Sequence, residues 1–143
     1  GVTFVDDYGH HPAEIEATLS AARNAYDKRV LVAFQPHRYT RTESLWDDFT
    51  RSFNKADVVL VCDIYAAGEK AIPGISSELL AKAIAEHGHG AVRYVKDRSE
   101  LAAELARIAR PGDVVIALGA GDVNKVLAPV AADIRARAGK GAP

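Results

Sequence analysis

Short apolar runs alternate with segments of helical periodicity along this chain, and that alternation most constrains the fold. The runs are rich in β-branched residues and mostly lack the polar alternation of a half-exposed strand, so they predict strands buried on both faces. They span residues 2–5, 30–34, 58–64, 92–95 and 114–118. Strands of this kind are typical of parallel sheets covered by helices.

Between the runs, apolar residues recur every three or four positions, as they do on one face of an α-helix. Pro12 is typical of a first helical position, while Thr40 with Glu43 and Asp97 with Glu100 have the spacing of a capping box. The sequence therefore predicts an α/β fold: a Rossmann-like three-layer sandwich whose mostly parallel open sheet has helices on both faces. The apolar sets are Ile15, Leu19, Ala22 and Tyr26; Leu45, Phe49 and Phe53; Leu79, Leu80, Ala83 and Ile84; Leu101, Leu105 and Ile108; Val123, Val126, Leu127, Val130 and Ile134.

Length and charge limit the class of protein. The 143 residues suit a single domain with its own core. With 18 Lys and Arg against 19 Asp and Glu, the chain lacks the basic surface that nucleic acid or an anionic membrane would require. We therefore expect neither as a partner.

Cysteine content and the two ends of the chain add further expectations. Cys62 is the single cysteine, and no apolar stretch has the length of a membrane span or signal peptide, which favours a reducing cytoplasm. The chain contains no Met and its first apolar run opens at Val2, so we expect a fragment of a longer protein. The Ala-, Gly- and Lys-rich stretch from about residue 136 to 143 predicts a flexible tail.

Polar side chains gather directly after four of the predicted strands. The stretches are DDYGHHP (6–12), QPHRYTR (35–41), DIYAAGE (63–69) and GAGD (119–122). In open α/β sheets, ligands bind outside the carboxyl ends of the strands. The sequence therefore predicts a binding site at that edge of the sheet.

Arg38 and Arg41 flank Thr40 at the predicted start of a helix. A cation at a helix amino end costs about 0.3 to 1 kcal/mol, so the pair predicts an anionic ligand, a carboxylate or phosphate held by guanidinium groups and helix N–H groups. The alternative is that both arginines pair with Asp47 and Asp48 on the protein's own surface.

The histidines support two interpretations. His10 and His11 are either ligand contacts or a polar lead-in to Pro12. They do not predict a metal site, because adjacent histidines point apart and no His-x-x-x-His or paired-Cys spacing accompanies them. His87 and His89 lie beside glycines at a predicted helix end, where we expect them to be solvated.

Nucleotide-binding motifs are incomplete. The stretch GAGDVN (119–124) has two glycines of the Gly-x-Gly-x-x-Gly fingerprint, but Asn124 replaces the third, and the chain has no P-loop. We therefore expect any ATP chemistry to need another domain. Cys62 lies within a predicted strand and should be a core side chain, whereas Asp63 either binds a ligand or pins a loop.

The motifs DDYGHHPAEI and FQPHRYTRT, followed by DIYAAGE and GAGD, closely resemble the C-terminal domain of the Mur ligase family. The resemblance follows the whole order of the chain and is sharpest over residues 4–74. Other Mur ligases resemble the first motif with a single Asp-Tyr-Ala-His and lack the HRYTR stretch. The paired histidines therefore favour the UDP-N-acetylmuramate:L-alanine ligases (MurC type). Ala66 stands where that family is expected to have proline, which leaves the stiffness of its loop open.

The resemblance implies a three-domain, ATP-dependent ligase of peptidoglycan biosynthesis. An amino-terminal domain would hold the UDP-sugar and a central domain the P-loop and Mg²⁺, both absent from this chain, which would be the third domain and close over them. ATP would phosphorylate the muramoyl carboxylate. L-Alanine would then attack the acyl phosphate through a tetrahedral intermediate.

By matching motif positions, the resemblance also implies residue roles. Asp7 would contact the ATP ribose, and His10, Arg38 and Arg41 would be catalytic. The isolated chain would be inactive. The residues that would bind the alanine substrate are Tyr8, His10, His37, Arg38 and Arg41.

Two other interpretations stay open on the residues alone. One is a stand-alone module that binds a small anion or nucleotide. The other is a receiver-like regulatory domain, suggested by Asp6 and Asp7 near a strand end, although the lysine arrangement of such domains is not evident.

Overall fold

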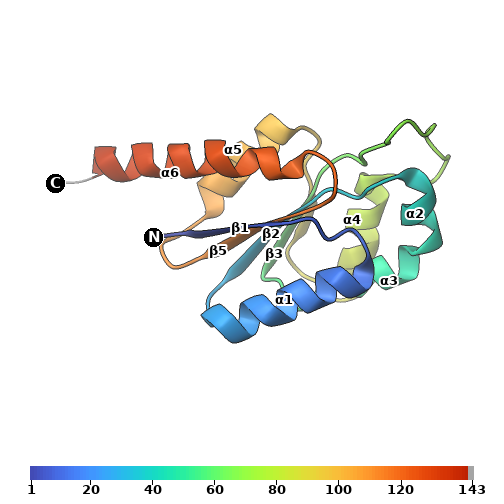
Figure 1. The fold of residues 1–143 in the computed structure, drawn as a ribbon, viewed down its shortest axis with the longest axis horizontal. Helices are drawn as coiled ribbons and strands as arrows, with labels where there is room; N and C mark the ends of the chain where they lie inside the picture. Colours follow the sequence, from blue (N-terminus) through green and yellow to red (C-terminus); the bar gives the residue numbers. More distant parts are fainter. Residues whose placement is uncertain (142–143) are drawn as a thin grey trace.

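The computed structural model describes residues 1–141. Its centre is a sheet of five parallel strands in the order β1-β5-β2-β3-β4 (Figure 1). The predicted α/β class with a parallel open sheet is confirmed. The strands are β1 (Thr3–Asp7), β2 (Val30–Phe34), β3 (Val58–Val61), β4 (Val92–Tyr94) and β5 (Val114–Leu118).

Helices cover both faces of this sheet, so the three-layer architecture is also confirmed. Side chains of α1, α3 and α4 pack on one face, against residues such as Val32. Side chains of α5, η1 and α6 pack on the other, against residues such as Ala33, and Figure 1 shows α5 and α6 together on that side. The helices are α1 (Pro12–Tyr26), α2 (Tyr39–Ser44), α3 (Trp46–Thr50), α4 (Ser77–Glu86), α5 (Arg98–Ile108), the 3₁₀ turn η1 (Val123–Val126) and α6 (Leu127–Gly141).

The strand register brings three loops to one edge. Leu118 at the end of β5 lies opposite Asp7 at the end of β1 and opposite Phe34 at the end of β2. The helices after β1 and β2 cross one face of the sheet, whereas η1 and α6 after β5 cross the other. The direction of the connections thus reverses on both sides of β5, which is where open α/β sheets form a ligand crevice.

The segment after β2 departs from the sequence prediction. A single helix capped by Thr40 was expected, but α2 begins at Tyr39 with Arg38 as its N-cap, and Leu45 (φ −111°, ψ 20°) separates it from α3. The predicted capping box with Glu43 is wrong because the Thr40 hydroxyl donates to Glu69 instead. The Thr40 hydroxyl is thus bonded to a residue distant in the sequence, Glu69, and not to the nearby Glu43.

Other helix ends agree only in part. Pro12 is the first residue of α1 as predicted, and His11 precedes it as an N-cap in a reciprocal capping box with Glu14 that the sequence argument missed. Asp97 is the N-cap of α5, but its side chain forms no capping hydrogen bond. The stretch predicted as a flexible tail from residue 136 is helical to Gly141, consistent with its Ala and Arg content; residues 142 and 143 lie outside the described part.

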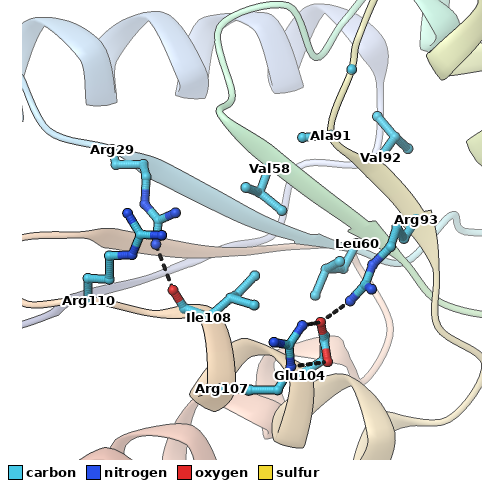
Figure 2. Close-up of a pocket in the computed structure, with 11 residues that line it drawn as sticks. Arg29, Val58, Leu60, Ala91, Val92, Arg93, Glu104, Arg107, Ile108 and Arg110 are labelled. Carbon is cyan, nitrogen blue, oxygen red and sulfur yellow. Dashed lines mark hydrogen bonds and ion pairs between the residues drawn. The ribbon is translucent and has the colours of Figure 1, made fainter.

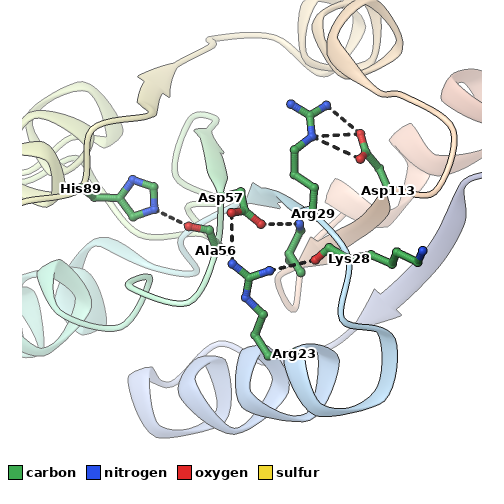
Figure 3. Close-up of polar contacts among 8 residues, drawn as sticks. Arg23, Lys28, Arg29, Ala56, Asp57, His89 and Asp113 are labelled. Carbon is green, nitrogen blue, oxygen red and sulfur yellow. Dashed lines mark hydrogen bonds and ion pairs between the residues drawn. The ribbon is translucent and has the colours of Figure 1, made fainter.

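Charged pairs tie down the amino end of β2 (Figure 3). Arg29 donates to Asp113 at 2.7 Å, and the 6% exposed Asp113 side chain also accepts from the backbone N–H of Arg110. Asp57 accepts from the backbone N–H of Val30 at 2.7 Å and from the Arg23 guanidinium at 3.0 Å. These contacts fix where β2 starts relative to β3 and β5.

His89 lies at the same end and corrects a prediction. It was expected to be solvated, yet it is buried: Nε2 donates to the carbonyl of Ala56 at 2.7 Å, and Nδ1 accepts from the backbone N–H of Ala91 at 3.2 Å. Two residues expected in helical stripes, Tyr26 and Leu79, are instead 40% and 44% exposed. Within residues 1–141, no helix is both long enough and apolar enough to span a membrane.

Candidate functional site

The loops after β1, β2 and β5 are joined by hydrogen bonds at the carboxyl edge of the sheet. The backbone N–H of Gly119 donates to the carbonyl of Asp7 at 3.1 Å, and that of Gln35 donates to the carbonyl of Leu118 at 3.0 Å. The buried side chain of Gln35 then holds the GAGD loop: its amide donates to Asp122 at 2.8 Å, and its carbonyl accepts from the backbone N–H groups of Asp122 and Val123.

Gly121 shows how closely this loop approaches its neighbours. A Cβ atom at this position would lie 2.5 Å from Oε1 of Gln35 and 2.7 Å from the ring of Tyr65. No side chain fits there without displacing both. The glycine therefore serves close packing between the loops after β2, β3 and β5.

Asp7, the predicted ribose contact, is the last residue of β1 and stabilises the turn into α1. Its Oδ1 accepts from the backbone N–H of Gly9 and its Oδ2 from the hydroxyl of Thr18, both at 2.7 Å. Each carboxylate oxygen has a further lone pair, so these contacts leave acceptor capacity for a ligand hydroxyl. In the same turn Tyr8 is 67% exposed, and His10 lies next to its backbone carbonyl.

His37 is the centre of a side-chain cluster. Its ring stacks on Tyr65 with centroids 5.5 Å apart and planes 9° apart, and the ring of His10 lies 6.0 Å away. Nη1 of Arg41 lies 3.1 Å from Nδ1 of His37. Because a guanidinium can only donate, Nδ1 is the acceptor and the proton of the neutral ring is on Nε2.

The electrostatics of this cluster favour the neutral imidazole. Burial lowers the pKa of His37, and the charges of Arg41, His10 and Arg38 lower that pKa further. His37 is therefore uncharged near neutral pH. It holds the Arg41 guanidinium in place without neutralising it.

Arg38 has an unusual backbone conformation at the start of α2. Its φ of 71° with ψ of 142° is a combination that side-chain-bearing residues rarely adopt, at a cost of about 1 to 3 kcal/mol. Hydrogen bonds on both sides hold it: its N–H donates to the carbonyl of Tyr65 at 2.8 Å, and its carbonyl accepts from the Thr42 hydroxyl at 2.7 Å. The side chain is exposed.

Glu69 occupies the position where the sequence argument placed a ligand anion. Its carboxylate accepts from the backbone N–H of Thr40 at 3.2 Å and from the Thr40 hydroxyl at 2.6 Å, and the hydroxyl bond is the main cause of the lowered pKa of Glu69. The amino end of α2 is therefore bound by the protein's own carboxylate. Helix N–H groups give no support for an external anion here.

Arg38 and Arg41 nevertheless have no carboxylate partner within residues 1–141. The alternative in which they pair with Asp47 and Asp48 is wrong for the described part of the chain. The structure thus brings His10, His37 and Arg41 into one cluster, with Arg38 beside it, and places Asp7 at the end of β1, before the loop that carries His10. Sequence reasoning missed Glu69 and Tyr65, although both lie in the quoted DIYAAGE motif.

The remaining candidates have structural roles. Cys62 is buried, which raises the pKa of its thiol to about 12, so it is a core side chain as predicted. Asp63 accepts a hydrogen bond from the hydroxyl of Tyr94, and Asp6 accepts one from Asn124 at 3.3 Å. Within the described residues, no group of three or more His, Cys, Asp or Glu side chains is arranged to hold a metal ion.

The model of the family described as "Mur ligase, glutamate ligase domain" matches residues 1–121, which include all five strands, the first three motif-bearing loops and residues 119–121 of the fourth. The chain belongs to the Mur ligase family.

Two curated relatives of this Mur ligase chain carry names that are more specific than the description of the family model. A Sorangium cellulosum protein named UDP-N-acetylmuramate–L-alanine ligase is 60% identical over 140 residues, covering 96% of this chain and 30% of that protein. A Myxococcus xanthus protein of the same name is 54% identical over 126 residues, covering 88% of this chain and 27% of that protein. The chain thus spans less than a third of the length of these relatives.

Solved structures support the fold. The UDP-N-acetylmuramate–alanine ligase of Thermotoga maritima gives a TM-score of 0.67 at 21% identity, covering 97% of this chain and 27% of that one. A murein peptide ligase of Psychrobacter arcticus gives a TM-score of 0.73 at 18% identity, covering 93% and 27%. In both, the similar region is again about a quarter of a longer chain.

Proposed function

We propose that this chain is the C-terminal domain of a longer UDP-N-acetylmuramate:L-alanine ligase. That enzyme would act in peptidoglycan biosynthesis in the reducing cytoplasm and use ATP to join L-alanine to the muramoyl carboxylate. The observation that carries the proposal is the 60% identity to a ligase of that name over 140 residues, which include every loop of the candidate site. No observation favours a stand-alone regulatory module.

The two arginines after β2 are suited to the amino-acid substrate. Arg38 and Arg41 supply guanidinium groups that have no carboxylate partner among the described residues, and a guanidinium binds a carboxylate through two parallel hydrogen bonds. Holding the carboxylate of L-alanine would fix its amine near the reacting centre, and the same charges would stabilise the negative charge that develops there. Neutral His37 orients Arg41, while Tyr8 and His10 complete the alanine site from the loop after β1.

The loop after β1 would also provide a contact to ATP. Asp7 is held by two internal hydrogen bonds and retains lone pairs that suit a ribose hydroxyl. ATP supplies the phosphoryl group that activates the muramoyl carboxylate. The described residues do not fit Mg²⁺, so the metal and the phosphates would be held mainly by the central domain of the longer enzyme.

An amide-forming assay tests this proposal. The longer protein should release ADP and form the L-alanyl product only when ATP, UDP-N-acetylmuramate and L-alanine are all present. The chain of 143 residues alone should neither form the amide nor hydrolyse ATP. Robust metal-dependent ATP hydrolysis by this chain alone would contradict it.

Asp7 is tested separately with a matched control. Asp7→Ala should raise KM for ATP with kcat largely unchanged, because a ribose contact contributes equally to ground-state and transition-state binding. Thr18→Val removes one hydrogen bond to the Asp7 carboxylate but leaves the carboxylate in place, and it should leave KM for ATP unchanged. An equal rise in both variants would mean that Asp7 acts only through the turn.

A further inference from the structure

A second group of arginines surrounds a cavity at the opposite end of the sheet. The cavity has a volume of about 400 Å³ and lies where β2, β3 and β4 begin (Figure 2). Four arginines line it. Among the described residues, Glu104 is the one carboxylate in the lining. The arginines are Arg29, Arg93, Arg107 and Arg110.

The floor of this cavity is apolar. Val58, Val92 and Ile108 line it and are only partly buried, because α5 ends at Ile108 and leaves the beginning of β3 and the edge strand β4 incompletely covered. A ligand that filled the cavity would remove this apolar surface from water. Burial would favour a ligand with an apolar or planar part.

The rim of the cavity has an excess of positive charge. Arg93 and Arg107 both hydrogen-bond to Glu104 and so share one carboxylate, with side chains still 56% and 65% exposed (Figure 2). Arg29 is neutralised by Asp113, and the side chain of Arg110 has no carboxylate partner within residues 1–141. Four arginines thus line a concave, partly apolar surface and are balanced by two carboxylates, Glu104 in the lining and Asp113 beside Arg29, which leaves a positive potential.

We propose that this cavity binds a small molecule in which a phosphate or carboxylate is attached to an apolar or planar ring. Arg93 and Arg107 retain free N–H donors after their bonds to Glu104, because each guanidinium carries five. Guanidinium groups bind such anions bidentately and also stack on ring faces. The site lies at the strand ends opposite the proposed ligase site, so the proposal does not depend on the ligase function.

Phenyl phosphate is a suitable probe, because it combines a phosphate with an apolar ring. Titrated into the isotope-labelled chain, it should shift the backbone amide signals of Gly90, Ala91, Val92 and Arg93, and added salt should weaken its binding. Inorganic phosphate, which lacks the ring, and benzyl alcohol, which lacks the charge, should each bind at least about tenfold more weakly, the equivalent of 1.4 kcal/mol.

Variants with opposite expected effects make the test specific. The double variant Arg93→Ala/Arg107→Ala should weaken phenyl phosphate binding by about tenfold or more, since two charge-assisted hydrogen bonds are lost. Glu104→Gln should strengthen it, because the carboxylate that competes for both arginines is removed. Arg51→Ala, an exposed arginine on the other face, is the matched control and should change nothing.

Three results would overturn the proposal. The first is the absence of amide shifts around β4, or shifts confined to the loops after β1, β2 and β5. The second is equal binding of benzyl alcohol or of inorganic phosphate, which would mean that the ring and the charge are not recognised together. The third is unchanged affinity in both the arginine double variant and Glu104→Gln, with melting temperatures confirming that the variants are folded.

Discussion

The two ends of β2 carry arginines in opposite electrostatic situations. At the amino end, Arg29 is held by the nearly buried carboxylate of Asp113 and by the carbonyl of Ile108. Just beyond the carboxyl end, Arg38 and Arg41 have no carboxylate partner in the described chain, and Arg38 has a backbone conformation with positive φ. One strand therefore begins in satisfied ion pairs and ends in unsatisfied charge.

This difference separates residues that stabilise the fold from residues kept for a ligand. A buried carboxylate that loses its cation is costly, so the Arg29 pair is expected to matter for folding. Charge without a counter-charge, next to a strained backbone, does nothing for stability, and such features concentrate at functional sites. Each of the following predictions tests one side of this contrast.

The largest effect is expected at the amino end. Arg29→Ala should lower the free energy of unfolding by about 3 to 5 kcal/mol, because the Asp113 carboxylate would remain buried with only the Arg110 N–H as a partner. Urea unfolding of the chain at neutral pH measures this, with Arg51→Ala as an exposed control expected to fall within about 0.5 kcal/mol of the parent. A decrease in the free energy of unfolding of less than about 1 kcal/mol would show that Arg29 does not stabilise the fold.

At the carboxyl end, activity should change instead of stability. In the longer ligase, Arg38→Ala and Arg41→Ala should each lower kcat/KM for L-alanine by about 30- to 1,000-fold, equivalent to about 2 to 4 kcal/mol of transition-state binding. The melting temperature should not fall. Lysine at either position should rescue only partly, since it keeps the charge but loses the planar two-pronged geometry. Near-normal kinetics in both alanine variants would make these arginines ordinary surface charges.

The backbone of Arg38 allows strain to be separated from charge. Arg38→Gly should be more stable than Arg38→Ala by about 1 kcal/mol, because glycine adopts positive φ without a steric cost. Both variants lack the guanidinium, so both should lose activity to a similar extent. Denaturant unfolding and the amide assay measure the two quantities on the same proteins. Equal stability of the glycine and alanine variants would show that the backbone here is unstrained.

The smallest effect concerns His37 and pH. Burial and the neighbouring positive charges hold its pKa below the ordinary value, about 6.5, so the unfolded chain binds a proton first as pH falls. Stability from neutral His37 is therefore present above about pH 6.5 and declines below it. NMR titration of the imidazole nitrogens should give a lowered midpoint that Arg41→Ala raises only partly, because burial is the larger cause. A midpoint at the ordinary value would contradict this.

The local pattern of apolar residues was sufficient to predict the sheet and the helical layers on its two faces. The bounds of β2 and β5 match the predicted runs because both strands are buried on both faces and every residue in them is apolar. The edge strand β1 was placed too early, since the polar Asp6 and Asp7 at its end still pair with Ala117 and Leu118 of β5. Asp6 and Asp7 belong to β1 because of its register with β5, and this register cannot be predicted from the apolar content of the segment.

The sequence predicted where the site lies but not which contacts its residues make. The motifs identified the loops, because their position after parallel strands is a local property of the chain. The bond from Thr40 to Glu69 depends on β3 lying beside β2, and the burial of His89 depends on the carbonyl of Ala56 in another loop. The positive φ of Arg38 has no sequence signal, since glycine is the residue that usually marks such a conformation.

The position of β5 has a consequence for how the domain is made. This strand is the last of the five in the sequence, yet it lies between β1 and β2 and is the strand with which β1 pairs. During synthesis β1 and β2 cannot be joined in one sheet until residues 114–118, which pair with both, have left the ribosome. Contacts of such long sequence separation form slowly, so most of the nascent domain is exposed to chaperones and proteases before β5 inserts between β1 and β2.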